Sequence, residues 1–194
     1  MNIINKFHNW RRKKRWNTQY KNGRWDNLRG KIEIERYKTI VDICKNYAKP
    51  NPSIIAMGCG EGILLDHLQS MPYSDFLGMD FSEVCIATAK QKTHPNSEFI
   101  CADIHTFVPK KTYDVIVYNE VFYYVQAAER QQVLNTALDH LSEKGIIIVS
   151  MFRDGKGAWT FFENPKLQEV QSVTIENDEK ENMYWKIATY TKKK

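Results

Sequence analysis

The segment from Ser53 to Leu68 constrains the fold of this chain more than any other part of the sequence. It opens with an apolar run, 54–57, that has no polar alternation and is typical of a parallel strand covered on both faces. Gly58, Gly60 and Gly62 follow, and glycine lets the backbone turn sharply and approach a ligand closely. Apolar residues at helical spacing come next. Because the first N–H groups of a helix lack partners within it, this strand, turn and helix predict a ligand-binding unit.

The spacing of the glycines indicates which ligand the turn binds. A dinucleotide-binding fingerprint, Gly-x-Gly-x-x-Gly, would place its third glycine at the position of Ile63. In this chain the third glycine comes one residue earlier. The sequence Gly58-Cys59-Gly60-Glu61-Gly62 instead resembles motif I of the class I S-adenosylmethionine-dependent methyltransferases.

Strands and helices alternate along the rest of the chain. We expect further strands at 75–80, 98–103, 113–119 and 145–151, and helices at 33–49, 83–92 and 129–141. Two β-like runs, 169–175 and 183–191, flank a polar turn at 176–182. The alternation predicts an α/β fold with a parallel sheet and helices on both faces. The last two runs resemble the antiparallel end of the methyltransferase sheet. The expected fold is therefore a Rossmann-like class I methyltransferase sheet, mostly parallel, with a C-terminal antiparallel hairpin.

Polar side chains stand at the ends of the expected strands. Asp80 ends the second, Asp103 the third, and Asn119 with Glu120 the fourth. In open α/β sheets, ligands bind beyond the carboxyl ends of the strands. Asp80 also lies twenty residues after Gly60, close to the offset of about 20 at which a carboxylate meets ribose hydroxyls. A carboxylate suits that task because its two oxygens can accept hydrogen bonds from both hydroxyls.

Later segments extend the resemblance over roughly residues 50–152. Residues 76–82 resemble motif II of the class I methyltransferases, 99–104 their adenine-binding segment, and 113–121 their motif IV. The resemblance implies S-adenosyl-L-methionine as the cofactor. It places Gly58 and Gly60 at the methionine end, Asp80 on the ribose, Asp103 on the adenine amino group, and Phe81 and Ile104 against the ring. Cys59, Asn119 and Tyr20 complete the candidate cofactor contacts.

One position departs from the family pattern. The family usually has Asp or Glu two residues before the first glycine, whereas this chain has Ala56. That acid helps to organise the methionine end of the cofactor. The resemblance therefore implies a substitute from elsewhere, and Glu61, Tyr20 and Arg36 are the candidates.

The catalytic candidates near the strand ends are Glu120, Tyr123 and His105. Methyl transfer from a sulfonium is an in-line displacement, which depends mainly on the proximity and alignment of the reactants. A base is needed only where the acceptor keeps its proton at neutral pH, as a hydroxyl does. Two of the candidates have competing interpretations, His105 as a surface-loop residue and Tyr123 as part of a pocket wall or of the core.

The region of motif IV bears on the methyl acceptor. Amino-methylases of bases and glutamine resemble one another in an Asn/Asp-Pro-Pro-Tyr/Phe loop, whereas this chain has Asn119-Glu120-Val121-Phe122. The segment 20–37 is similar to the start of small methyltransferases that tailor sugars, glycans and natural products. We therefore expect methyl transfer to O or N of a small polar, carbohydrate-like acceptor. Two alternatives stay open: an RNA or protein methyltransferase that uses a basic N-terminal arm, and a non-catalytic cofactor-binding subunit.

The N-terminal segment is basic and aromatic. Much of the net charge of +5 lies at the two ends of the chain, and the block 11–15 is flanked by Trp10 and Trp16. Such a block can bind phosphates, although most are solvated arms or helix faces. The aromatic residues within 16–30 follow no clear period, and large exposed aromatic area usually covers something. We expect 16–30 to form a lid over the cofactor, with ordinary packing as the competing interpretation. The expected division is a basic arm and cap helix at 1–49 and a cofactor-binding domain at 50–194.

The remaining composition bears on the compartment. The four cysteines form no Cys-x-x-Cys pair, which indicates reduced thiols and a cytoplasmic protein. No apolar run approaches the ~20 residues of a membrane span, and the basic start lacks the apolar core of a secretory signal. We expect no metal site, because the cysteines and histidines show no metal-ligand spacing. The oligomeric state stays open.

Overall fold

One seven-stranded sheet organises the computed structural model, which describes residues 3–176 and 182–193. The strands are β1 (Ser53–Met57), β2 (Asp75–Asp80), β3 (Ser97–Cys101), β4 (Tyr113–Asn119), β5 (Leu141–Phe152), β6 (Leu167–Glu176) and β7 (Tyr184–Lys192). Their order across the sheet is β3-β2-β1-β4-β5-β7-β6. Neighbouring strands from β3 to β5 pair in parallel, and β7 runs antiparallel to both β5 and β6. The predicted fold class is confirmed.

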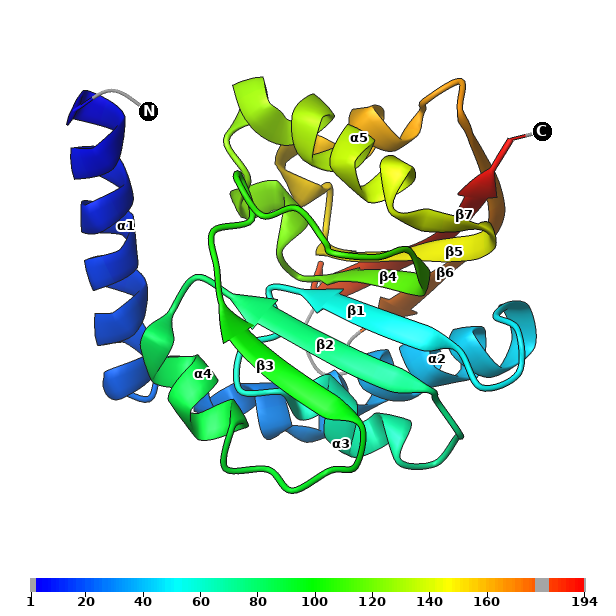
Figure 1. The fold of residues 1–194 in the computed structure, drawn as a ribbon, viewed down its shortest axis with the longest axis horizontal. Helices are drawn as coiled ribbons and strands as arrows, with labels where there is room; N and C mark the ends of the chain where they lie inside the picture. The colour runs from blue at the N-terminus through cyan, green and yellow to red at the C-terminus, as the bar shows by residue number, and fades with distance from the viewer. Residues whose placement is uncertain (1–2, 177–181, 194) are drawn as a thin grey trace.

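Helices cover both faces of the sheet (Figure 1). One face packs against α2 (Lys31–Tyr47), α3 (Ile63–Leu68) and α4 (Glu83–Ala89). The other face packs against α5 (Arg130–Asp139) and two 3-10 segments, η2 (Phe122–Tyr124) and η4 (Gly155–Phe162), while η3 (Ala127–Glu129) leads into α5. The central strand β1 is buried along its whole length, which is why its sequence shows no polar alternation.

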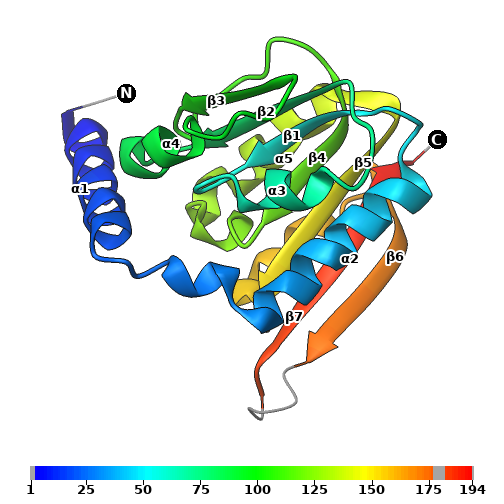
Figure 2. The same ribbon diagram turned by 90° about the horizontal axis from the view of Figure 1, so that it is seen from below.

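The first helix, α1 (Ile3–Lys21), stands beside α4 instead of lying on the sheet (Figures 1 and 2). The basic block 11–15 therefore belongs to a helix, and the interpretation as a helix face is the one that the structure supports. Arg12, Trp16 and Tyr20, four residues apart, turn towards the protein, whereas Trp10 and Lys14 are exposed. The sequence pattern did not reveal this helix, because its inner face combines a cation with aromatic residues instead of presenting an apolar stripe. A 3-10 turn, η1 (Asp26–Arg29), connects α1 to α2.

A few element boundaries differ from the expected ones. β5 begins at Leu141 because that residue already pairs with Tyr113, ahead of a register shift between the two strands. α4 ends at Ala89 and α5 begins at Arg130, so both are shorter than predicted. The expected turn at 176–182 falls mostly outside the described residues. Within the described part of the chain, no helix is both long and apolar enough to cross a membrane.

Asp114 joins four segments at the N-terminal ends of the parallel strands, opposite the ends that carry Asp80 and Asn119. Its Oδ2 accepts hydrogen bonds from the backbone N of Ser53 at 2.9 Å and from the Ser53 hydroxyl at 2.7 Å. Its Oδ1 accepts from the Ser142 hydroxyl at 3.0 Å and lies 3.1 Å from Nζ of Lys49. Burial alone would raise the pKa of Asp114, but these hydrogen bonds and the lysine outweigh it and lower the pKa.

Replacing this carboxylate should destabilise the fold in a pH-dependent way. We expect Asp114→Asn to lower the free energy of unfolding at pH 7 by about 1–3 kcal/mol, because buried donors lose their acceptor. A carboxyl whose pKa is lowered by folding stabilises the protein above its unfolded pKa of about 3.9, and that stabilisation is lost as the pH falls through the folded pKa. The difference between the two proteins should therefore shrink below about pH 4 in denaturant titrations. Asp42→Asn, which alters an exposed acid on α2, is the control. Equal stability of the two variants at pH 7 would contradict the assignment.

Candidate functional site

A cavity of about 330 Å³ lies between the C-terminal ends of the central strands and the segment formed by α1, η1 and α2. Small-molecule sites typically range from about 300 to 1,000 Å³. All the residues predicted to bind the cofactor or to act in catalysis line this one cavity: Tyr20, Gly58, Cys59, Gly60, Asp80, Phe81, Asp103, Ile104, His105, Asn119, Glu120 and Tyr123. Sequence positions more than a hundred residues apart therefore meet in a single site.

The glycine turn needs glycine at two positions that face the cavity. Gly58 has φ +70°, and a Cβ at this position would stand 2.4 Å from Cγ2 of Val121. Gly60 has φ +54°, and its Cβ would stand 3.0 Å from the hydroxyl of Tyr20. Any residue other than glycine is therefore disfavoured at both positions, because of the positive φ and because its Cβ would meet a neighbouring side chain. The turn brings bare backbone to the cavity wall.

Asp80 fixes the glycine turn from the end of β2. Its Oδ2 accepts from the backbone N–H of Gly60 at 3.0 Å, and its Oδ1 accepts from the backbone N–H of Ser82 at 2.9 Å. Desolvation raises the pKa of Asp80, although the N–H groups of Ser82 and Gly60 oppose the shift. Each carboxylate oxygen can accept more than one hydrogen bond, so both keep capacity for a ligand.

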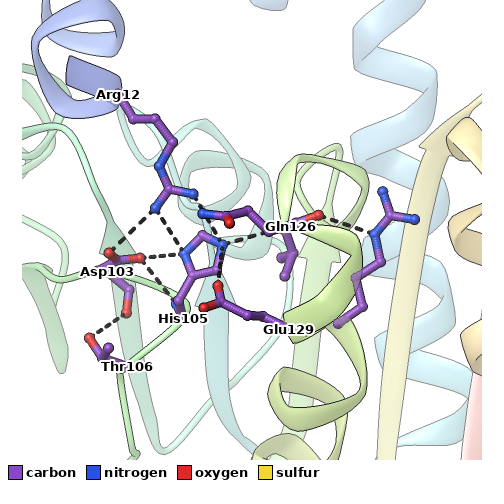
Figure 3. A network of polar contacts seen from close by, with 8 residues as sticks. Arg12, Asp103, His105, Thr106, Gln126 and Glu129 are labelled. Atoms are coloured by element: carbon purple, nitrogen blue, oxygen red, sulfur yellow. Dashed lines mark hydrogen bonds and ion pairs between the residues drawn. The ribbon is translucent and has the colours of Figure 1, made fainter. Parts of the chain in front are cut away.

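Asp103 lies in a polar network that reaches three parts of the chain (Figure 3). One carboxylate oxygen is 2.6 Å from Nδ1 of His105, and the other is 3.6 Å from the guanidinium of Arg12 on α1. Nε2 of His105 accepts from the backbone N–H of Gln126 at 3.3 Å and is 3.4 Å from the Glu129 carboxylate. Burial would raise the pKa of Asp103, but hydrogen bonds from His105 and the charge of Arg12 outweigh it and lower the pKa. The network ties α1 to the loop after β3 and to the start of α5.

Glu120 occupies the other side of the cavity, after β4. Its backbone has φ +58°, a conformation that is uncommon for a residue with a side chain. The Tyr123 hydroxyl donates to Oε2 at 2.8 Å, and the Ser150 hydroxyl donates to Oε1 at 3.4 Å. Burial raises the pKa of Glu120 to about 7, even though the nearby Arg36 and the Tyr123 hydroxyl favour the charged form. This carboxyl can therefore exchange a proton at neutral pH.

Arg36 is a buried cation beside Glu120, with 1% of its side chain exposed. Its guanidinium donates to Oε2 of Glu33 and to Oδ1 of Asn119, and it lies 4.9 Å from the ring centroid of Tyr37 and 5.9 Å from that of Trp185. Sequence reasoning missed Glu33 as a cavity residue. The available signal was Arg36 itself, because it falls at helical spacing with Ile40 and Ile43 on the apolar face of its helix.

Side chains of the segment 16–30 line the cavity, while the role of this segment as a lid stays a prediction. Trp16 stacks on Trp25 with ring centroids 5.4 Å apart and meets Tyr124 edge-on at 4.9 Å. The Ser82 hydroxyl donates to Asn17 at 2.7 Å. The third linkage is an ion pair of 2.6 Å between Arg29 in η1 and Glu61 in the glycine turn. Of the three proposed substitutes for an acid at position 56, Glu61 is therefore already engaged by the lid.

Residues 54–145 match the protein family described as "Methyltransferase domain". Among curated proteins, the malonyl-[acyl-carrier protein] O-methyltransferase of Bacillus anthracis is 35% identical over 101 residues, which is 51% of this chain and 37% of that protein. The trans-aconitate 2-methyltransferase of Yersinia pseudotuberculosis is 28% identical over 130 residues, 66% of this chain and 49% of that protein. The chain thus spans less than two fifths of the length of the first curated relatives that it matches.

Solved structures share the fold at low sequence identity. The N-methyltransferase NodS from Bradyrhizobium japonicum, in complex with S-adenosyl-L-homocysteine, has a TM-score of 0.74 at 18% identity and covers 88% of this chain and 92% of its own. The 1,6-didemethyltoxoflavin-N1-methyltransferase of Burkholderia thailandensis has a TM-score of 0.78 at 10% identity and covers 100% of this chain and 92% of its own. The similarity extends through the N-terminal segment as well as the sheet.

Removing the Arg12 contacts should loosen α1. We expect Arg12→Ala to raise hydrogen exchange of the amides at 10–21 by about tenfold, which corresponds to about 1.4 kcal/mol of opening free energy. Lys14→Ala, on the exposed side of the same helix, is the matched control. If both variants leave exchange at wild-type rates, the polar network does not hold the helix in place.

Proposed function

We propose that this chain, a small class I S-adenosylmethionine-dependent methyltransferase by domain match and fold, methylates O or N of a small polar, carbohydrate-like acceptor. The observation that carries the proposal is Glu120, a carboxyl with a pKa of about 7 at the wall of an aromatic cavity that also contains the glycine turn. In this proposal a bound cofactor and a proton acceptor would share one cavity.

The residues present fit S-adenosylmethionine. The turn at Gly58 and Gly60 forms a cradle that any Cβ would fill. Asp80, at the end of β2, would receive the ribose hydroxyls, and Asp103 the adenine amino group, with Phe81 and Ile104 beside the ring. Trp25 also lines the cavity, and its buried indole N–H has no hydrogen-bond partner among the described residues. A polar ligand would satisfy that donor.

The chain itself would contribute alignment, exclusion of water and a base. When bound, S-adenosylmethionine supplies an electrophilic methyl group on a sulfonium. The lid at 16–30 would close over the cavity with its aromatic rings and keep water from the reacting groups. Glu120 would accept the proton of an acceptor hydroxyl or amine, and Tyr123, which donates to Glu120, would orient the carboxylate. His105 would act as a positioning residue for Asp103 and not as a base.

The cavity walls favour a ring-shaped acceptor with polar edges. Trp16, Trp25 and Tyr124 offer broad amphipathic faces, and Glu120 lines the same cavity as a hydrogen-bond acceptor. The named relatives methylate other acceptors, malonyl-[acyl-carrier protein] and trans-aconitate. A carboxylate acceptor needs no base, so Glu120 favours a hydroxyl or an amine instead.

A protein or RNA acceptor is the second candidate. The exposed side of α1 carries Arg11, Lys14 and Arg15 beside Trp10, which is 57% exposed. This surface would attract a negatively charged macromolecule. Turnover on sugar nucleotides, and none on tRNA or proteins, would favour the carbohydrate-like acceptor. Cofactor binding without turnover on any acceptor would favour a non-catalytic subunit.

The chain divides functionally into a cap, 1–49, and a cofactor-binding domain, 50–194. The cap supplies Tyr20, Trp25 and Arg36 to the cavity, and the domain supplies the strand ends. We place its action in the cytoplasm, which the free thiols of Cys44, Cys59, Cys85 and Cys101 support.

Calorimetry should show binding of S-adenosylhomocysteine and no binding of NAD. Asp80→Asn should lower the affinity for S-adenosylhomocysteine by about one to two decades, since a hydrogen bond to a charged acceptor contributes about 1.5–3 kcal/mol. Asp80 also holds the glycine turn, so part of that loss would arise from a looser turn. Asp75→Asn, at the other end of β2, is the control and should bind normally. Binding of NAD without the sulfur nucleoside would overturn the proposal.

The pH dependence of turnover should follow the ionisation of the Glu120 carboxyl. Because its charged form accepts the proton, kcat/KM should rise with pH and reach half its plateau near pH 7. Tyr123→Phe removes a hydrogen bond that favours the carboxylate, so the profile should move to higher pH. Glu120→Gln should lower kcat by about 10²–10⁴-fold and leave S-adenosylhomocysteine binding intact. A flat profile between pH 6 and 8 in the wild-type protein would rule out this role.

A further inference from the structure

Glu33 and Arg36 form a buried ion pair at one end of the cavity. They project from the first turns of α2 and contact the β4 end through Asn119. Asp80 and Asp103 stand at the ends of β2 and at the loop after β3, on the opposite side of β1 in the strand order. The cavity therefore has a carboxylate pair at one end and a carboxylate–guanidinium pair at the other.

The register of the sheet places this ion pair over the position of Ala56. Ala56 pairs with Val117 of β4, and both belong to the apolar cluster beneath α2. Asn119 lies two residues beyond Val117, and side chains two residues apart on a strand face the same side of the sheet. Arg36 binds Asn119 from above that face. The pair thus occupies the space towards which a longer side chain at 56 would extend.

The two members of the pair differ in what they can offer a ligand. Arg36 is 1% exposed, so its guanidinium has almost no surface left for a ligand. The Glu33 side chain is 13% exposed, and both hydrogen bonds from Arg36 end on its Oε2. Its Oε1 accepts no hydrogen bond within the described part of the chain and can take a cationic donor from the cavity. Glu120, the other nearby carboxyl, already accepts from Tyr123 and Ser150.

We propose that Glu33 binds the α-ammonium group at the amino-acid end of S-adenosylmethionine and replaces the acid that Ala56 lacks. Arg36 is a positioning residue, which holds Oε2 of Glu33 and leaves Oε1 for the ligand. The assignment rests on the proposed function. It makes α2 a cofactor-binding element, so that the two ends of the cofactor are held by different parts of the chain.

The test compares two ligands on two proteins. S-adenosylhomocysteine and its desamino analogue differ only in the α-ammonium group, and calorimetry measures the affinity of each. Wild-type protein should prefer S-adenosylhomocysteine by about tenfold to hundredfold, which is about 1.4–2.8 kcal/mol. Glu33→Gln should lose most of this preference, because its binding of S-adenosylhomocysteine weakens while that of the analogue is unchanged. Glu35→Gln, an exposed acid on the same helix that pairs with Lys38, should keep the wild-type preference.

The outcomes separate this assignment from the proposed function. If the wild-type protein binds neither ligand, the proposed function fails. If it binds both ligands equally, or if Glu33→Gln retains the full preference, the assignment of Glu33 is overturned while the function stands. Melting temperature monitors folding. Should Glu33→Gln not fold, Glu33→Asp keeps the charge beside Arg36 but withdraws it by one methylene, and an unchanged preference in that variant would equally overturn the assignment.

Discussion

The buried guanidinium of Arg36 is the contact on which the arrangement of the cavity depends. Moving a charge out of water costs several kcal/mol per ion unless partners compensate it. Two of the partners of Arg36, Glu33 and Tyr37, lie on α2 itself and move with it. The other two, Asn119 and Trp185, belong to the sheet, so all four are met only where α2 holds Arg36 over the end of β4. Since Asn119 belongs to β4, the requirement fixes the rotation and height of α2 over the sheet. The turn η1 and the helix α1 are then carried to the mouth of the cavity.

The two parts of the N-terminal segment are held by different forces. α2 buries Tyr37, Ile40 and Ile43 in the core and can separate only with loss of that apolar packing. α1 adds only partly buried rings, Trp16 and Tyr20, to that packing. Its other contacts are hydrogen bonds and ion pairs to Glu83, Asp103 and His105 at half-buried or exposed positions. Such contacts contribute little individually, because solvent screens them. The difference makes α1 the element that can move for a ligand to enter, while α2 stays in place.

Much of the fold could be predicted from the sequence because its sheet obeys simple patterns. The run at 54–57 gives a buried strand, and the alternation after it gives a parallel sheet whose carboxyl ends gather Asp80, Asp103 and Asn119. The family prediction agrees with the domain match over residues 54–145. α1 was missed because its inner face pairs Arg12 with aromatic residues, and a hydrophobicity pattern does not register a cation that packs on Phe81 at 5.5 Å. The role of Glu33 in the cavity was missed because it depends on a contact across 83 residues, from Arg36 to Asn119.

The division between a tightly packed sheet and a loosely held cavity wall explains how a domain of this fold could serve different acceptors. The strand-end carboxylates belong to the sheet, so their geometry follows from backbone pairing and cannot change without disturbing the core. The walls made by Trp16 and Trp25 come from α1 and the turn after it, which carry little of that core. Tyr124 comes from η2, where it stands two residues after the buried Phe122. Under the proposed function, substitutions there would alter the shape of the acceptor space at small cost to folding. Glu120 stands at the boundary between the two regions, since it follows β4 directly but its Tyr123 partner lies in η2. The pKa of its carboxyl therefore depends on how closely the variable wall encloses it, because burial is the largest influence on that pKa.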